Sequence, residues 1–121
     1  MGDKGFLKMA AVAMAMVLMA GCSGSDSEKP TIKVFQSDAS LQCESAGISL
    51  EDMRKVLDAA NVPVHCAQKG HTGRMYMALC GSPTGNINIY TIPEAQLEQA
   101  QRLGFAAVST LVDYQDMPCE E

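Results

Sequence analysis

The chain has 121 residues, five cysteines, no tryptophan and a formal net charge of −5. This length limits it to one small domain, and the acidic balance gives no reason to expect nucleic acid or an anionic membrane face as a partner. The hydrophobic fraction of 47% is raised by the amino terminus, which holds five of the nine methionines: Met1, Met9, Met14, Met16 and Met19.

Residues 1–21 have the composition of a secretory signal peptide. Lys4 and Lys8 make the start positively charged, and residues 9–20 form an uncharged apolar run. This run is too short to span a bilayer, which takes about 20 residues, whereas roughly 7–15 apolar residues behind a basic start are typical of a secretory signal. The pattern therefore predicts export from the cytoplasm.

A lipidation motif follows the apolar run. The segment Leu18-Met19-Ala20-Gly21-Cys22 resembles the lipobox of bacterial lipoproteins, with a bulkier second residue than usual. The resemblance implies cleavage before Cys22, a diacylglyceryl thioether on its thiol, and acylation of the new amino terminus, for example with palmitate. Ser23 stands where an aspartate would resemble the inner-membrane retention signal, so we expect anchoring to the outer membrane, facing the periplasm.

Composition divides the remaining chain into three parts. Removal of residues 1–21, which carry two lysines and one aspartate, changes the net charge from −5 to −6. Residues 22–30 are small and polar and predict a flexible, lipid-bearing tether. Residues 31–112 contain the periodic segments and predict one domain, followed by a tail at 113–121.

Four cysteines remain beyond Cys22, namely Cys43, Cys66, Cys80 and Cys119. An even number of cysteines in a small exported domain indicates disulfides, and four cysteines allow three pairings. The expected strand order favours Cys43–Cys66 and Cys80–Cys119, because the loop after the first strand and the far end of the second would lie at one end of the sheet.

The expected elements alternate between strands and helices. The first helix is predicted from Ser49, three residues before Asp52, and from apolar residues at helical spacing that end near Asn61. Pro93 suits the start of the second helix and Gly104 its end. In chain order we expect strands at 31–35, 62–66, 74–80, 87–91 and 105–108, helices at 50–60 and 93–103, and turns at 70–73 and 81–85.

This order, β-α-β-β-β-α-β, predicts the α+β class. Short connections favour a mostly antiparallel sheet with two helices on one face, as a small two-layer sandwich stapled by disulfides. A ferredoxin-like arrangement with one extra strand is the leading variant.

The domain also resembles a family of small exported proteobacterial proteins with no assigned activity. The resemblance rests on Cys80-Gly81-Ser82-Pro83-Thr84-Gly85, on Ile87-Asn88, on Ile92–Leu97 and on Leu103-Gly104-Phe105. It implies that residues 80–105 are the signature of the domain, and it implies no activity.

Soft ligands suggest one chemical hypothesis. Thioethers, thiolates and imidazoles select Cu(I), so His65, Cys66, His71, Met75 and Met77 form a candidate site for copper handling or thiol redox. Against it, methionine is common in ordinary cores, and the set lacks the tight spacing of a metal motif.

The turn at 81–85 suggests a second site. Gly81, Ser82, Thr84 and Gly85 combine flexible backbone with hydroxyl groups and could bind an anion through backbone amides. Ordinary turn chemistry explains the same residues. The sequence contains no hydrolase or phosphate-loop motif, so we expect no catalytic residues and no cofactor.

Two functions therefore stay open at this point. The first is a non-catalytic binding or structural module, held to the membrane through Cys22, with an envelope protein as partner. The alternative is a periplasmic copper-handling or thiol-redox protein.

Overall fold

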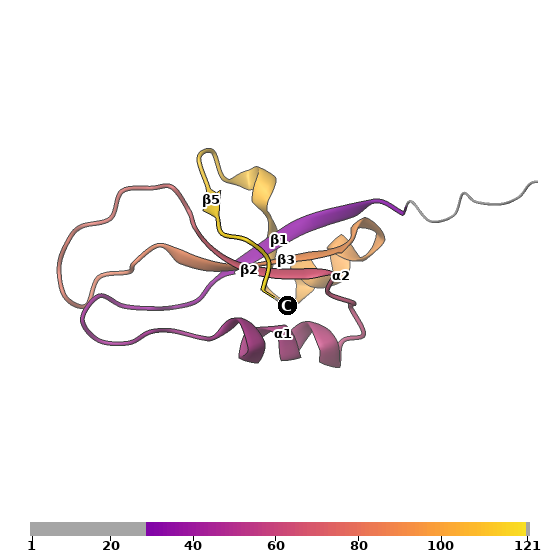
Figure 1. The fold of residues 1–121 in the computed structure, drawn as a ribbon, viewed down its shortest axis with the longest axis horizontal. Helices are drawn as coiled ribbons and strands as arrows, with labels where there is room; N and C mark the ends of the chain where they lie inside the picture. Colours follow the sequence, from indigo (N-terminus) through magenta and orange to yellow (C-terminus); the bar gives the residue numbers. More distant parts are fainter. Residues whose placement is uncertain (1–28, 121) are drawn as a thin grey trace, which may run out of the picture.

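The computed structural model describes residues 29–120 (Figure 1). The predicted signal peptide, Cys22 and most of the predicted tether lie outside the described residues, so these remain predictions. The elements are β1 (Thr31–Ser37), α1 (Leu50–Ala59), β2 (Cys66–His71), β3 (Asn86–Pro93), the 3-10 turn η3 (Glu94–Gln96), α2 (Leu97–Arg102), β4 (Ala106–Ala107), the 3-10 turn η4 (Val108–Thr110) and β5 (Gln115–Asp116).

The strands form one antiparallel sheet in the order β4-β1-β3-β2-β5. With two helices beside it, the sheet confirms the predicted α+β class. Ser37 pairs with Ile87, and His71 pairs with Asn86. As a result β1 and β2 end, and β3 begins, at the same end of the sheet, which is where two long loops leave it.

Helix α1 begins and ends where the sequence predicts. The hydroxyl of Ser49 accepts a hydrogen bond from the backbone N–H of Asp52 at 3.0 Å, a cap typically worth about 1 kcal/mol. Asn61 takes a left-handed backbone conformation with φ of 62°, which ends the helix. The buried face consists of Leu50, Met53 and Leu57.

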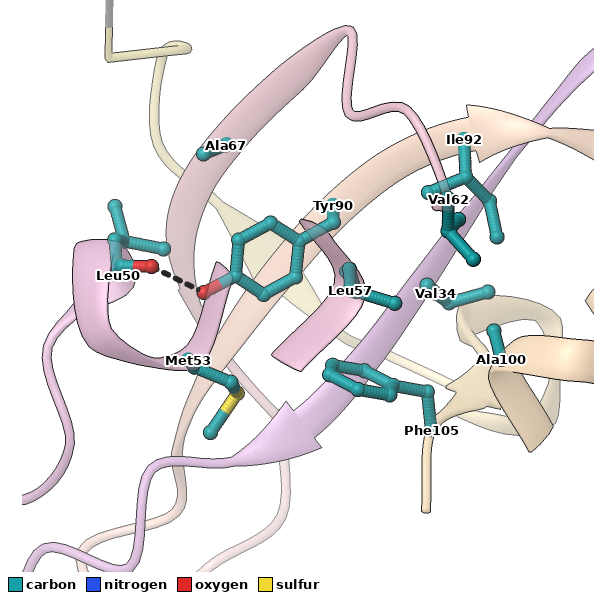
Figure 2. Packing of buried hydrophobic residues seen from close by; sticks show 10 residues of the cluster. All are labelled: Val34, Leu50, Met53, Leu57, Val62, Ala67, Tyr90, Ile92, Ala100 and Phe105. Atoms are coloured by element: carbon teal, nitrogen blue, oxygen red, sulfur yellow. Dashed lines mark hydrogen bonds between the residues drawn. The ribbon is translucent and has the colours of Figure 1, made fainter. Parts of the chain in front are cut away.

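Both helices contribute to one apolar cluster against the sheet (Figure 2). Tyr90 is fully buried in this cluster, and its hydroxyl donates to the carbonyl oxygen of Leu50 at 2.6 Å. Its ring meets Phe105 edge-on at a centroid distance of 5.9 Å. Burial raises the pKa of Tyr90 above its ordinary value of 10.0, so the hydroxyl stays a donor. The other members include Val34, Leu57, Val62, Ile92 and Ala100.

The opposite face of the sheet is also covered. Ile87 and Ile89 are buried outside this cluster and alternate with Tyr90 along β3, so they lie on the other face. Figure 1 shows the segment containing η4 and β5 passing over the face opposite α1. Residues 113–120, which the sequence suggests as a tail, thus lie along the sheet, with the N–H of Glu120 donating to the carbonyl of Ala67 at 2.7 Å.

Two expected strands differ from the structure. The strand expected at 62–66 instead begins at Cys66 and runs through His71, so it includes half of the turn expected at 70–73. Val62 leads into it and is buried among the core residues, which explains the apolar alternation there. The segment 74–80 is not a strand, because β2 already occupies the edge of β3 beside which it would pair.

Candidate functional site

Two loops leave the end of the sheet where β1 and β2 stop. The first, residues 38–49, joins β1 to α1, and the second, residues 72–85, joins β2 to β3. A disulfide between Cys43 and Cys80 joins them, with the two Cα atoms 5.0 Å apart. Figure 1 shows both loops projecting together from one end of the molecule, and we call them the paired loops.

A buried ion pair holds the base of the paired loops. Asp38 is 1% exposed, and its carboxylate lies 2.8 Å from Nζ of Lys69. The same ammonium group donates to the side-chain oxygen of Asn88 at 2.6 Å. Asn88 in turn donates to the carbonyl of Ile48 at 3.0 Å. The network therefore connects both ends of the first loop to β2 and β3.

The charge of Asp38 is favoured at this position. Burial by itself would raise the pKa of its carboxyl group, but hydrogen bonds from the Lys69 ammonium and from the Ser40 hydroxyl and N–H outweigh burial. The pKa therefore lies below its ordinary value of 3.8. Asp38 is therefore an anion whose partners are all in place, and its role is to hold the first loop against the sheet.

Backbone hydrogen bonds continue the contact between the loops. The N–H of Gln42 donates to the carbonyl of Ser82 at 2.9 Å, and the N–H of Gly81 donates back to the carbonyl of Gln42 at 2.8 Å. Further toward the base, the N–H of Thr84 donates to the carbonyl of Ser40 at 3.3 Å. The loops thus form a short ladder without being regular strands.

This ladder bears on the proposed anion-binding turn at Gly81, Ser82, Thr84 and Gly85. The N–H groups of Gly81 and Thr84 donate to the first loop, and the N–H of Ser82 donates to the carbonyl of Leu79 at 2.9 Å. The hydroxyl of Thr84 bonds the hydroxyl of Ser40 and accepts from the N–H of Asn86. In this conformation three of the amides needed for an anion are already used within the protein.

The first loop also carries backbone strain. Ala39 and Cys43 both have positive φ, at 62° and 67°, a region that non-glycine residues occupy at a cost of about 1–2 kcal/mol each. Since the disulfide and the ladder involve this same loop, they offset the strain and fix its shape.

The second loop is tied inward through Tyr76. Its hydroxyl lies 2.9 Å from the hydroxyl of Thr72, and its ring meets His71 edge-on at 5.7 Å. Gly85 faces this ring so closely that a Cβ there would collide with it, and its φ of 83° also favours glycine. Tyr76 is half-buried as a result.

The residues on either side of Tyr76 point the other way. Met75 is 97% exposed, Met77 71% and Leu79 57%. Methionine and leucine are among the residues most often found inside proteins, so three of them alternating on one exposed segment form an unusual surface. The alternation of 74–80 that predicts a strand comes from this arrangement, with Tyr76 inward and the aliphatic side chains outward.

The structure separates the residues of the candidate copper site. Cys66 forms a disulfide with Cys119, with Cα atoms 5.5 Å apart, so it supplies no thiolate. His65 immediately precedes β2 and His71 ends it, so six residue steps, about 20 Å of extended chain, separate the two histidines. Met75 and Met77 are near one another in sequence and lie on the second loop, away from His65.

His71 has neighbours on both ring nitrogens. The N–H of Gly73 donates to Nδ1 at 2.9 Å, and Nε2 lies 3.0 Å from the carbonyl oxygen of Thr84. Nε2 therefore carries the proton and donates, while Nδ1 accepts. Within residues 29–120, no group of three His, Cys, Asp or Glu side chains is arranged to hold a metal ion.

The disulfide pairing favoured from the sequence, Cys43–Cys66 and Cys80–Cys119, is wrong. The observed pairs are Cys43–Cys80 and Cys66–Cys119. The favoured pairing depended on Cys66 at the far end of the second expected strand, whereas Cys66 begins β2, at the end of the sheet remote from the first loop. Cys80 meets Cys43 because residues 72–85 form a loop beside the first loop, and the carboxyl-terminal segment running along β2 brings Cys119 to Cys66.

A cavity also lies away from the paired loops. It has a volume of about 510 Å³ and separates the polar face of α1 from the start of β2. Its lining includes carboxylates and cations in nearly equal number, from Glu51, Arg54, Lys55, Asp58 and Glu120. Arg54 is engaged with Asp58 at 3.9 Å and with the carbonyl of Val64 at 3.3 Å, so this cavity presents no single charge for a ligand.

Of the helices described, none has the length and apolar character to cross a membrane. No protein-family model, curated protein or solved structure matches this chain. The functional conclusion therefore rests on the paired loops and on the amino-terminal sequence.

Proposed function

We propose that this chain is a lipid-anchored protein of the bacterial envelope whose domain is a non-catalytic binding module. The observation that carries the proposal is the exposed aliphatic series Met75, Met77 and Leu79, presented on a loop that is held in place by the Cys43–Cys80 disulfide. Exposed apolar side chains on an ordered scaffold are typical of surfaces that bind another protein.

The position of the amino terminus supports this proposal. Thr31 begins β1 at the end of the sheet opposite Ser37, from which the first loop leaves, and the strand covers about 20 Å between them. The predicted tether at 22–30 adds at most about 30 Å when extended. A lipid on Cys22 would therefore hold the domain by the end remote from the paired loops and leave them accessible.

Both disulfides fit an oxidising compartment, where such bridges form and persist. They use all four cysteines of the described domain. The exposed surface thus depends on covalent links that an exported protein can keep, which agrees with the signal and lipidation pattern of residues 1–22.

The anchor is tested by intact mass. The full chain is expressed in a bacterial host with its own amino terminus, and its mass is measured before and after alkylation without reduction. We expect a chain beginning at Cys22 that carries a diacylglyceryl group and one acyl group and gains no mass on alkylation. Cys22→Ser is the matched control and should carry no lipid. An unlipidated full-length wild-type chain would overturn the anchor, and alkylated cysteines would contradict the disulfides.

The binding surface is tested by photo-crosslinking in the same cells. A photoreactive residue at Met75 should give a discrete crosslinked protein product. The same residue at Glu98, whose side chain is 82% exposed on α2, is the control and should not give that product. Equal products from both positions would reflect random collision and would contradict a binding role for the paired loops.

A further inference from the structure

The Cys43–Cys80 disulfide joins the tips of two turns. Cys43 lies at the centre of a turn in which Leu41 and Ser45 exchange two backbone hydrogen bonds of 3.1 Å. Cys80 lies in a second turn, which a backbone hydrogen bond of 2.9 Å closes across residues 79–82. Both cysteines are exposed. A thiolate from outside the protein can therefore reach the bridge, and access of this kind is one of the conditions for disulfide exchange.

The backbone of Cys43 is strained while the bridge is closed. Of the four bridged cysteines, all of which lie within residues 29–120, only Cys43 has a positive φ, at 67°. Ala39, in the same loop, has a φ of 62°. This conformation is unfavourable for a residue with a Cβ, and a loop freed from the bridge can leave it. The strain therefore favours the open form, since strained or exposed disulfides are the more easily reduced ones.

The Cys66–Cys119 disulfide lies within regular pairing instead. Cys66 begins β2 and is half-buried. Cys119 is flanked by two backbone hydrogen bonds to β2, donated by the N–H groups of Met117 at 2.9 Å and of Glu120 at 2.7 Å. This pairing would hold the two thiols close together after reduction, so they would re-form their bridge at a high effective concentration. We therefore expect this second bridge to resist reduction.

The hydrogen bonds nearest Cys43–Cys80 give weaker support, and they come from Gln42. Its backbone pairs with the turn at 79–82, and its side-chain amide bonds backbone groups of the second loop at Met77, Leu79 and Pro83. These side-chain hydrogen bonds are exposed, so water competes for them and their net contribution is small. Because the aliphatic side chains of this loop face solvent, burial adds little to them.

We propose that Cys43–Cys80 is a redox-active bridge that a dithiol reduces reversibly, and that its opening releases the outer part of the paired loops, residues 41–45 and 74–82. The proposal rests on the proposed function, because it names the regulation of the same exposed aliphatic surface. With the bridge closed, the surface has a fixed shape for a partner to bind. With the bridge open, that shape is lost.

The exchange transfers two electrons between the dithiol and the bridge. One thiolate of the dithiol attacks a bridge sulfur and forms a mixed disulfide, and the other protein sulfur leaves as a thiolate that takes up a proton. The second thiol of the reductant, as its thiolate, then displaces the remaining protein sulfur, which is protonated in turn. The products are two protein thiols and the internal disulfide of the oxidised reductant. The same steps in reverse close the bridge.

The base of the paired loops does not depend on this bridge. The ion pair of Asp38 with Lys69 and the hydrogen bond from the N–H of Ile48 to the carbonyl of Asp38, at 2.7 Å, involve no cysteine. Opening should therefore speed amide exchange at Gln42 and Gly81, whose N–H groups donate between the loops. It should leave exchange at Ile48 and in β3 unchanged, so the loss of order is confined to the presented surface.

The first test titrates the full exported chain with mixtures of reduced and oxidised dithiothreitol. Open cysteines are trapped by alkylation, and each bridge is scored by peptide mass. We expect Cys43–Cys80 to open at a ratio of dithiol to disulfide about tenfold lower than Cys66–Cys119, the order of effect that one strained residue gives. At a ratio that opens only the first bridge, hydrogen exchange should be faster at Gln42 and Gly81 but not at Ile48.

Two matched variants test why the bridges differ. Gln42→Ala removes the side-chain contacts beside Cys43–Cys80 and should let that bridge open at a ratio about two- to tenfold lower still, with Cys66–Cys119 unchanged. Gln68→Ala is its counterpart, because the side-chain amide of Gln68 donates to the carbonyl of Met117, close to Cys119. This variant should shift only the second bridge.

The third test connects the bridge to binding in cells. The photo-crosslinked product from position 75 should fall several-fold in the double variant Cys43→Ser with Cys80→Ser. It should persist in Cys66→Ser with Cys119→Ser, which keeps the first bridge.

Opening of both bridges at one ratio, or of Cys66–Cys119 first, would overturn the proposal. Faster exchange throughout β3 when only Cys43–Cys80 is open would overturn it as well, because the bridge would then support the whole fold. Selective opening with no crosslinked product from position 75 in any variant would overturn the binding role and leave the redox-active bridge standing, so the two ideas fail separately.

Discussion

The two ends of the sheet are ordered by different forces. Around β3 and α1, order comes from burial: Val34, Leu57 and Ile92 are all at 0% exposure. In the paired loops, order comes from a disulfide, a buried ion pair and side-chain hydrogen bonds, and the aliphatic side chains there face solvent. Buried apolar side chains therefore stabilise the fold, whereas those of the paired loops are presented to solvent. Substitutions that leave the core unchanged can accordingly still disorder the loop end of the sheet.

Breaking the disulfides should have the largest effect. The Cys43–Cys80 bridge closes a separation of 37 positions and the Cys66–Cys119 bridge one of 53. For loops of this length the chain-entropy account gives a stabilisation of about 4 kcal/mol from each bridge. The double variant Cys43→Ser with Cys80→Ser should lower the free energy of unfolding by this order in urea titration. It should also speed amide hydrogen exchange in the paired loops far more than in β3.

The matched control is Cys66→Ser with Cys119→Ser. It should cost a similar free energy of unfolding but speed exchange in the carboxyl-terminal segment along β2 instead. If both double variants loosened the same amides, the paired loops would not be a separately ordered region.

The next comparison sets one buried side chain against one exposed side chain of similar size. Leu57→Ala should lower the free energy of unfolding by about 3 kcal/mol, because it leaves a cavity between α1 and the sheet. Met77→Ala should change it by less than about 0.5 kcal/mol, because the side chain is 71% exposed. Thermal or urea unfolding of both variants measures the difference, and a large loss from Met77→Ala would show that the loop side chains support the fold.

The sequence predicts the elements whose signals are local. Ser49 caps α1 as expected, and Gly104, with φ of 103°, ends α2 as expected. β1 and β3 follow from runs of strand-forming residues, although each extends beyond its predicted range. Such signals depend only on neighbouring residues, so they can be recognised without knowing the fold.

The parts that the sequence does not predict depend on which distant segments meet. Asp38, Lys69 and Asn88 look like ordinary solvent-facing polar residues until the loop and two strands bring them together. Gln42 has no sequence signal for its role, because its side-chain partners Met77, Leu79 and Pro83 are 35 or more positions away. The favoured disulfide pairing is wrong for the same reason: the alternation at 62–66 does not say where the strand begins, and Cys66 stands at its start rather than at its far end.

The buried ion pair at the base of the paired loops can be compared with an exposed ion pair elsewhere on the sheet. Lys69→Met keeps the length of the side chain and removes its charge, leaving Asp38 buried without its ammonium partner. We expect a loss of about 2 kcal/mol in the free energy of unfolding. Lys33→Met is the control, since its ion pair with Asp116 at 3.0 Å is more exposed and is worth about 0–1 kcal/mol. Equal losses from the two variants would argue that the Asp38 network has no special part in ordering the loops.

The smallest expected effect is the pH dependence contributed by Asp38. Its pKa in the folded chain is lowered below 3.8, so the unfolded chain binds the proton more readily. The contribution to stability is therefore complete above this ordinary value and is lost as the pH falls through the lower, folded-state pKa. Urea unfolding of wild type between pH 6 and about pH 2 should show this loss. Asp38→Asn, which has no proton to gain there, should show a shallower decline. Because the carboxylate holds Lys69 at the base of the loops, the same acid range should speed hydrogen exchange in the paired loops before it does so in β3. A decline of equal slope in Asp38→Asn would show that the charge of Asp38 does not distinguish the two ends of the sheet.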